Sequence, residues 1–113
     1  MATVQNLVID QGTTFSFTFS IQNADGTDKD LSDYSVASQI RKSYYTNTKV
    51  DVTTDTIPLE GEVTISLTAE ETSNIKAGRY VYDVEINSSF ETLRVLEGIV
   101  TVTPELIVAI SNV

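Results

Sequence analysis

The sequence predicts an all-β fold, an antiparallel immunoglobulin-like β-sandwich of about seven strands with one short helix. Phe15, Phe17, Phe19 and Ile21 occupy alternate positions and are separated by Ser and Thr. Side chains alternate between the two faces of a strand, so this period places all four on one side of a sheet, whereas a helix would scatter them. Runs of the same period recur between turn signals that are spaced about ten residues apart. A small closed barrel made from the same strands is the alternative architecture.

The first half of the chain contains several segments that are predicted to be strands. Turns separate them at Gln11-Gly12, where a bulge is the alternative, at Asp25-Gly26, and around Pro58 and Gly61. One of the segments is expected to be only a short edge strand, because polar residues surround its two valines. The predicted segments are Val4 to Asp10, Thr13 to Gln22, Ser35 to Lys42, the short Val50 to Val52, and Glu62 to Thr68.

The hydrophobic period changes after the last of these strands. Thr68 and Glu71 fit a capping box, in which the side chain of each accepts a hydrogen bond from the backbone N–H of the other. Thr72 and Ile75 continue a three-residue spacing, and Gly78 is a natural helix terminator. The pattern therefore predicts one or two helical turns between strands.

Two long strands are predicted to complete the sheet. Arg79 to Asn87 alternates apolar and charged residues, so one of its faces is expected to be wet or lightly covered. Phe90 to Thr103 also alternates, but Leu96 and Val102 interrupt the pattern. This strand is expected either to be covered on both sides or to bulge at Gly98.

One hydrophobic core is expected to join these elements. It is expected to consist of apolar residues at the inward-facing positions of the predicted strands. The predicted core residues are Phe15, Phe17, Phe19, Ile40, Val63, Ile65, Leu67, Tyr82, Val84, Ile86, Leu93 and Val95.

Length and composition restrict the functional class. The 113 residues are expected to form one domain, in which residues 104–113 are a tail that pairs with a strand. The chain has no cysteine and no histidine, which removes thiolate zinc sites and the most common general base. A formal net charge of −9 argues against nucleic acid and anionic membrane surfaces as partners. We also expect no signal peptide, no cofactor and no enzymatic activity.

Acidic residues provide the candidate metal and catalytic sites. The segment 23–30 places oxygen-bearing side chains around Gly26, as calcium loops do, but a tight turn explains the same residues and is the favoured interpretation. Glu70 with Glu71, or Asp83 with Glu85, would be the carboxylate pair of a glycosidase. Helix capping explains the first pair better and a solvent-facing strand explains the second, so no catalytic or metal-binding residue is predicted.

Candidate partner contacts lie in a loop and in the tail. Tyr44 and Tyr45 fall in a polar stretch, where aromatic rings are expected to be exposed and available to a partner. The tail after Pro104 is largely apolar, although it follows the last predicted strand. It is expected to close its own sheet or to pair with a neighbouring subunit. The predicted contact residues are Tyr44, Tyr45, Leu106, Ile107, Val108 and Ile110.

Several short segments, in this order and spacing, resemble a family of tailed-bacteriophage virion proteins and are similar to the N-terminal domain of phage baseplate upper proteins. The likeness covers nearly the whole chain, and Asp33 stands where that pattern usually has glycine. The matching segments are Gln11 to Phe15, Asp25 to Thr27, Asp30 to Tyr34, Ser38 to Lys42, Thr68 to Thr72, Gly78 to Glu85, Leu96 to Val100 and Val102 to Glu105.

The resemblance implies a non-enzymatic structural or assembly protein of the tail, the baseplate or the head surface. Its expected location is the virion, after synthesis in the host cytoplasm, and its expected partners are other virion proteins or further copies of itself. Exposed edge strands suit such repeated contacts. The alternative is a carbohydrate-binding module that mediates attachment to a host surface, for which Tyr44 and Tyr45 would supply the aromatic platform.

Overall fold

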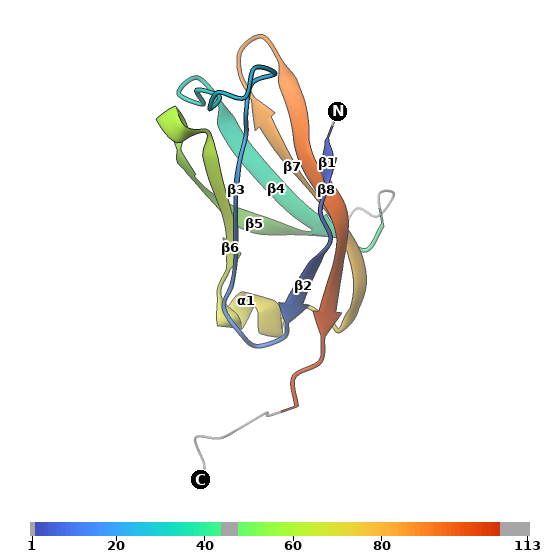
Figure 1. The fold of residues 1–113 in the computed structure, drawn as a ribbon. Coiled ribbons are helices and arrows are strands. Elements are labelled where there is room, and N and C mark those ends of the chain that lie inside the picture. Colours follow the sequence, from blue (N-terminus) through green and yellow to red (C-terminus); the bar gives the residue numbers. More distant parts are fainter. Residues whose placement is uncertain (1, 44–47, 107–113) are drawn as a thin grey trace.

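The computed structural model describes residues 2–43 and 48–106, which form an all-β fold with one short α-helix and one 3₁₀ turn (Figure 1). Within the described residues, no helix is both long enough and apolar enough to cross a membrane. The elements are β1 (Thr3–Val4), β2 (Leu7–Asp10), β3 (Phe15–Ser20), β4 (Ser35–Arg41), β5 (Lys49–Ile57), η1 (Pro58–Glu60), β6 (Glu62–Leu67), α1 (Ala69–Ser73), β7 (Gly78–Asn87) and β8 (Thr92–Thr103).

The strands form one strongly curled sheet, a half-barrel, in the order β1-β8-β7-β4-β5-β6-β3, with β2 also paired to β8. The prediction of an all-β fold is confirmed, but the prediction of a sandwich of two separate sheets is wrong. β5 explains the difference, because its first residues pair with β4 while Thr53 to Ile57 pair with β6. This strand is longer than the predicted short edge strand, and it makes the sheet continuous around the core.

The two N-terminal strands pair in parallel with β8, so the sheet is not wholly antiparallel as predicted. The single predicted strand Val4 to Asp10 is interrupted at Gln5 and Asn6, and β2 continues along β8 with Leu7 opposite Val100. The first and last strands of the described chain are therefore neighbours at one margin of the half-barrel.

An irregularity in β8 resolves its broken alternation. The register with β7 shifts so that Val84 pairs with Leu96 while Glu85 pairs with Arg94, which leaves Val95 as the extra residue. The extra residue therefore lies three positions before Gly98, where the sequence suggested a bulge. Gly98 has a different role, because a Cβ at this position would lie 2.4 Å from the Gln5 carbonyl oxygen.

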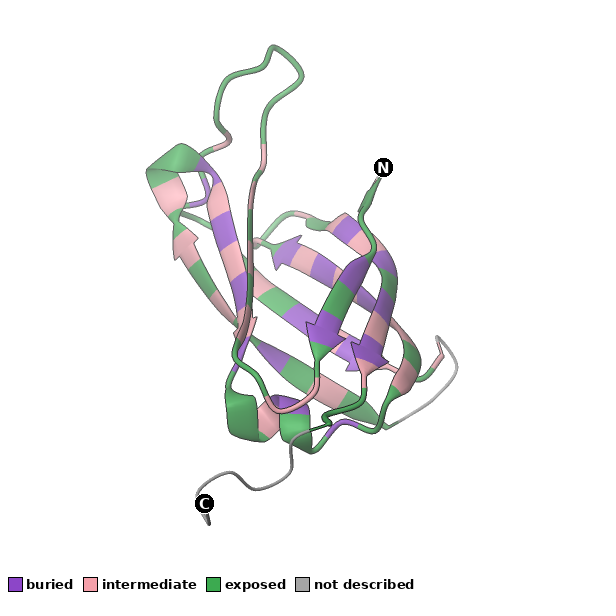
Figure 2. Cartoon of the chain, turned by 60° about the horizontal axis from the view of Figure 1, so that its bottom comes forward, coloured by how far each residue is buried: buried purple, intermediate pink, exposed green. Residues whose placement is uncertain are grey.

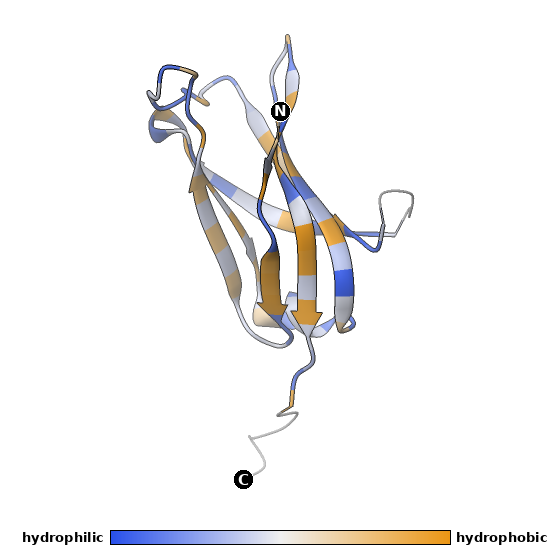
Figure 3. Cartoon of the chain, turned by 45° about the vertical axis from the view of Figure 1, so that its right-hand side comes forward, coloured by the Kyte–Doolittle hydropathy of each residue, from blue (hydrophilic) through white to orange (hydrophobic). Residues whose placement is uncertain are grey.

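The core lies on the concave side of the sheet and consists of the alternate inward residues of its strands. Figure 2 shows buried residues alternating with more exposed ones along β7 and β8, and Figure 3 shows hydrophobic residues concentrated on β2 and β8. The confirmed core predictions are Ile40, Val63, Ile65, Leu67, Tyr82, Val84 and Ile86. The core residues missed by the sequence are Leu7, Ile9, Leu31, Val52, Ile75, Leu96, Val100 and Val102.

The predicted core positions at the margins of the half-barrel are less buried than expected. Phe15, Phe17, Phe19 and Val95 are half-buried and pack against the core, and Leu93 is 39% exposed. The reason is their place in the sheet, since β3 is the last strand and nothing among the described residues pairs with its far side.

The short helix closes one end of the half-barrel and has the predicted capping box. The Glu71 N–H donates to the Thr68 hydroxyl at 3.1 Å, and the Thr68 N–H donates to the Glu71 carboxylate at 2.8 Å. Thr72 is fully buried, and its hydroxyl accepts from the Gly12 N–H and donates to the Thr13 carbonyl. These bonds fix α1 against the turn between β2 and β3.

Candidate functional site

β3 provides an open edge at one margin of the half-barrel. It pairs with β6 on one side, from Phe15 opposite Leu67 to Ser20 opposite Glu62, and no described strand pairs with its other side. An unpaired edge presents backbone N–H and C=O groups that can accept a further strand. Alternation along β3 places its three phenylalanines on the inner face, where the rings of Phe17 and Phe19 stack with centroids 6.1 Å apart.

A hollow of about 530 Å³ lies between this edge and the opposite margin of the half-barrel, which β1 and the first half of β8 form. We call this hollow the seam groove. Its volume falls within the range of ordinary ligand pockets. Six of the residues that line it define the groove here: Thr3, Phe17, Phe19, Ile21, Leu93 and Leu96.

The seam groove combines an apolar wall with polar and basic groups. Lys29 and Arg94 are among its lining residues, but the Arg94 guanidinium lies on the outer face of the sheet, where it pairs with three carboxylates. Leu93 shows how the groove depends on the curl of the sheet, because its partner in β7 is the fully buried Ile86 while Leu93 itself stays 39% exposed. A half-exposed apolar wall beside an unpaired strand edge can hold an extended, partly apolar peptide.

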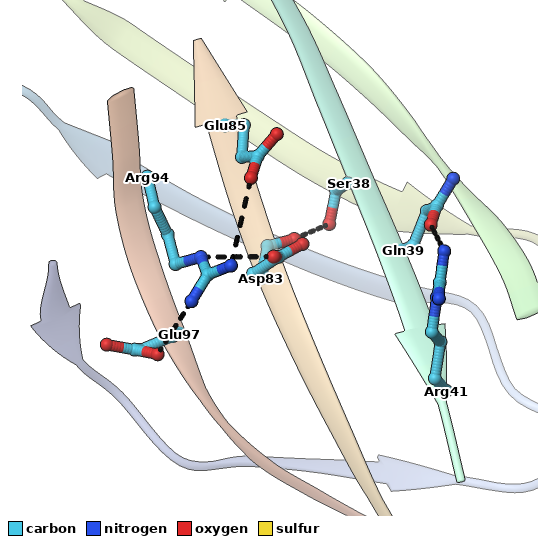
Figure 4. Close-up of polar contacts among 7 residues, drawn as sticks. All are labelled: Ser38, Gln39, Arg41, Asp83, Glu85, Arg94 and Glu97. Carbon is cyan, nitrogen blue, oxygen red and sulfur yellow. Dashed lines mark hydrogen bonds and ion pairs between the residues drawn. The ribbon is translucent and has the colours of Figure 1, made fainter. Parts of the chain in front are cut away.

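A second hollow, of about 310 Å³, lies on the outer face of β4, β7 and β8 and is polar. Figure 4 shows the Arg94 guanidinium between three carboxylates. It lies 3.2 Å from Asp83, 3.9 Å from Glu85 and 3.6 Å from Glu97. Nearby, the Arg41 guanidinium donates to the side-chain Oε1 of Gln39 at 2.9 Å (Figure 4).

We call this second hollow the outer trough. It accounts for one of the carboxylate pairs considered above. Asp83 and Glu85 lie on the solvent-facing side of β7, as the strand period predicts, and both belong to the ion pairs of Arg94. The Arg94 side chain is 45% exposed, so the pairs are screened by solvent and contribute little to stability. The Ser38 hydroxyl donates to the backbone carbonyl of Asp83 at 2.8 Å and ties β4 to β7 beneath them.

The acidic segment 23–30 forms the tight turn that was favoured over a calcium loop. Gly26 has a φ of +87°, and the Asn23 carbonyl accepts from the Gly26 N–H at 2.9 Å. The Asp25 carboxylate accepts from the hydroxyl and the N–H of Thr27, and these bonds lower its pKa. Asp30 makes the same contacts with Ser32, which lower its pKa in the same way. Within residues 2–43 and 48–106, no three His, Cys, Asp or Glu side chains gather into a metal-binding group.

The predicted contact residues fall largely outside the described part of the chain. Leu106 is described and is 92% exposed. Tyr44, Tyr45, Ile107, Val108 and Ile110 lie outside the described residues.

The seam groove itself was not predicted, because the sequence does not say which strand ends the sheet.

The exposure of Phe90 was also not predicted. It is 74% exposed and meets the ring of Tyr34 edge to face at 6.3 Å. The three-residue turn signal Asn87-Ser88-Ser89 just before it was the available indication of an exposed hairpin tip.

Comparison with known proteins adds little to this geometry. No protein-family model matches the chain, and no curated protein matches it. Among solved structures, the chain is similar to Listeria monocytogenes InlP, with 15% identity and a TM-score of 0.49 over 90% of this chain. The chain spans 28% of the length of that protein.

Proposed function

We propose that this chain is a non-enzymatic structural or assembly protein of a tailed-phage virion, located in the tail, the baseplate or the head surface, and that it acts through protein–protein contacts. The observation that carries the proposal is the seam groove, in which Phe17, Phe19 and Leu93 line a hollow beside the unpaired edge of β3. Apolar surface of this kind marks interaction sites, and an open strand edge suits addition of a partner's strand. The phage context comes from the resemblance of the sequence.

A structural role is also supported by the chemistry of the polar residues. The chain has neither histidine nor cysteine, so a nucleophile would need an unusual base. The carboxylates of Asp83 and Glu85 are bound to Arg94, and Glu71 caps α1. Each candidate catalytic carboxylate named above, Glu70 apart, therefore has a structural partner.

A carbohydrate-binding module is the alternative, and the geometry favours it less. Its expected platform, Tyr44 and Tyr45, lies outside the described residues. The polar outer trough offers hydrogen-bonding groups, but the aromatic residue in its lining is Tyr82, which is only 2% exposed. Sugar stacking needs an exposed ring face, which Tyr82 does not offer.

The proposal can be tested on phage-like particles assembled with this chain or with its variants. Leu93→Glu places a charge in the seam groove, and Ile99→Glu is a matched control because Ile99 lies on the same strand and is 38% exposed but does not line the groove. We expect antibody-gold to label phage-like particles that contain the wild-type chain or Ile99→Glu. Particles assembled with Leu93→Glu should lose the label.

Two results would contradict the proposal. Failure of the antibody to label any phage-like particle would remove the virion role. Equal labelling for Leu93→Glu and Ile99→Glu would remove the seam groove as the contact site. Circular dichroism of each purified chain shows that both variants are folded before the particles are compared.

A further inference from the structure

We infer that the seam groove accepts residues 106–110 of a second copy of this chain as an added strand beside β3, an inference that rests on the proposed assembly function. The acceptor side is the unpaired edge of β3 together with the apolar wall behind it. A strand inserted there would gain backbone hydrogen bonds from β3 and would extend the sheet toward β1, narrowing the gap in the half-barrel.

The donor segment has the sequence Leu106-Ile107-Val108-Ala109-Ile110, and Pro104 and Glu105 separate it from the end of β8. β-Branched residues dominate it, as in strands that pack on a half-buried surface. Alternation places Leu106, Val108 and Ile110 on one face, and this larger apolar set would meet Phe17, Phe19 and Leu93. Leu106 is 92% exposed, so an isolated chain leaves its first donor side chain in water.

The chain's own segment is too short to extend along the whole groove. The Glu105 N–H donates to the Gln11 side chain at 3.0 Å, which holds the start of the segment beside the turn between β2 and β3. From Glu105 the apolar run ends five residues later at Ile110, so it reaches at most about 18 Å.

The far end of the groove, at Phe19, lies beyond this reach. Phe19 is seven residues beyond Gly12 along the chain that leads into β3, or roughly 23 Å at the rise of a strand. In Figure 1, β8 ends near α1, whereas β3 runs away from α1 toward the opposite end of the molecule. A full-length contact with the groove therefore requires the segment of another copy.

The test uses full-length chains in which either the acceptor or the donor is blocked. Leu93→Glu blocks the acceptor, with Ile99→Glu as its control. The double substitution Val108→Glu/Ile110→Glu blocks the donor face, with Ile107→Glu as its control on the opposite face. Sedimentation equilibrium measures the dissociation constant of self-association for each chain, and circular dichroism verifies that each is folded.

Blocking either side should raise the dissociation constant by at least about tenfold, whereas both controls should stay close to the wild type, because a charge placed in an apolar contact is strongly disfavoured. Mixing the two blocked chains is the decisive measurement. The Leu93→Glu chain keeps its donor and the Val108→Glu/Ile110→Glu chain keeps its groove, so the mixture should form a one-to-one heterodimer. A contact made by the same patch on both copies would not recover in this way.

The outcomes separate this inference from the proposed function. If the wild-type chain self-associates but the donor-blocked chain associates equally well, or if the mixture does not recover, donation of residues 106–110 is wrong. If the chain stays monomeric at all concentrations while Leu93→Glu particles still lose the antibody label, the groove binds another virion protein. The inference then fails while the proposed function stands.

If Leu93→Glu is unfolded, a cysteine pair replaces it, with Ser20→Cys in one chain and Val108→Cys in another. Because the natural chain has no cysteine, a disulfide dimer would support the inference and its absence would overturn it.

Discussion

At the scale of single residues, one contact joins the N-terminal segment to the middle of the sheet. The Tyr82 hydroxyl donates to the Gln5 carbonyl at 2.5 Å. The same carbonyl lies over Gly98, where a Cβ would approach it within 2.4 Å. A glycine is therefore needed here for close approach and not for an unusual backbone angle, since Gly98 is not among the glycines with positive φ.

This contact gives the stability of the fold a pH dependence at the alkaline end. Burial raises the pKa of Tyr82 to about 12, whereas an unfolded tyrosine titrates near 10. Above about pH 10 the unfolded state therefore binds fewer protons than the folded state, and stability falls as the pH rises toward about 12. Urea unfolding between about pH 8 and about pH 11 should show a steeper loss for the wild type than for Tyr82→Phe. Parallel curves for the two chains would contradict the prediction.

At the scale of elements, the helix α1 is held less by its length than by one buried hydroxyl. Five residues are too few for a helix that is stable alone, so tertiary contacts must support it. Thr72 supplies them by bonding the Gly12 N–H at 3.0 Å and the Thr13 carbonyl at 2.8 Å. Its neighbour Ser73 is exposed and bonds only within the helix, to the Glu70 carbonyl among the described contacts.

Substitutions at these two neighbours should therefore differ. Thr72→Val keeps the shape but leaves the Gly12 N–H and the Thr13 carbonyl without this partner, which should lower the free energy of unfolding by about 1–3 kcal/mol. Ser73→Ala should change it by less than about 0.5 kcal/mol, as exposed substitutions usually do. Chemical denaturation of both chains measures the difference. Equal values would mean that the Thr72 bonds do not fix the helix.

The same elements show how far the sequence could predict this fold. Local signals were sufficient for β3, β4, β6 and β7, and the capping box located α1, because alternation and capping depend only on nearby residues. The rest depends on pairing between distant segments. Nothing local indicates that β2 runs parallel to β8, or that β5 turns from β4 to β6 and so merges two layers into one sheet.

The candidate site was harder to predict for the same reason. Phe17 and Phe19 were recognised as inward-facing, but their half-exposure follows from the position of β3 at the end of the sheet. Leu93 was assigned to the core because its alternation is correct, and the curl of the sheet then places it in the wall of the groove. A sequence pattern gives the face of a strand but not its neighbours.

At the scale of the whole molecule, charge opposes the association that the groove favours. Each copy carries a net charge of −9, so two copies repel each other over distances comparable to the Debye length. That length is about 30 Å at 0.01 M salt and about 8 Å near physiological ionic strength. Added salt therefore weakens the repulsion and leaves apolar contacts in the groove largely unaffected.

Self-association of the intact chain should accordingly strengthen as the salt concentration rises. Sedimentation equilibrium at ionic strengths between about 0.01 M and about 0.5 M provides the measurement. The Leu93→Glu chain is the reference for association that does not use the groove. Association that weakens with salt would indicate a contact made by charge pairs, against this prediction.

The parallel pairing of β2 with β8 also has a mechanical consequence. Four consecutive residue pairs join these strands, from Leu7 opposite Val100 to Asp10 opposite Thr103. Tension applied through the segments before β1 and after β8 would pull the two strands past each other along their length. Their hydrogen bonds would then bear the load together and would have to break together, unlike the bonds of a hairpin pulled open from its ends. A stretching force applied across β2 and β8 would therefore meet four residue pairs at once.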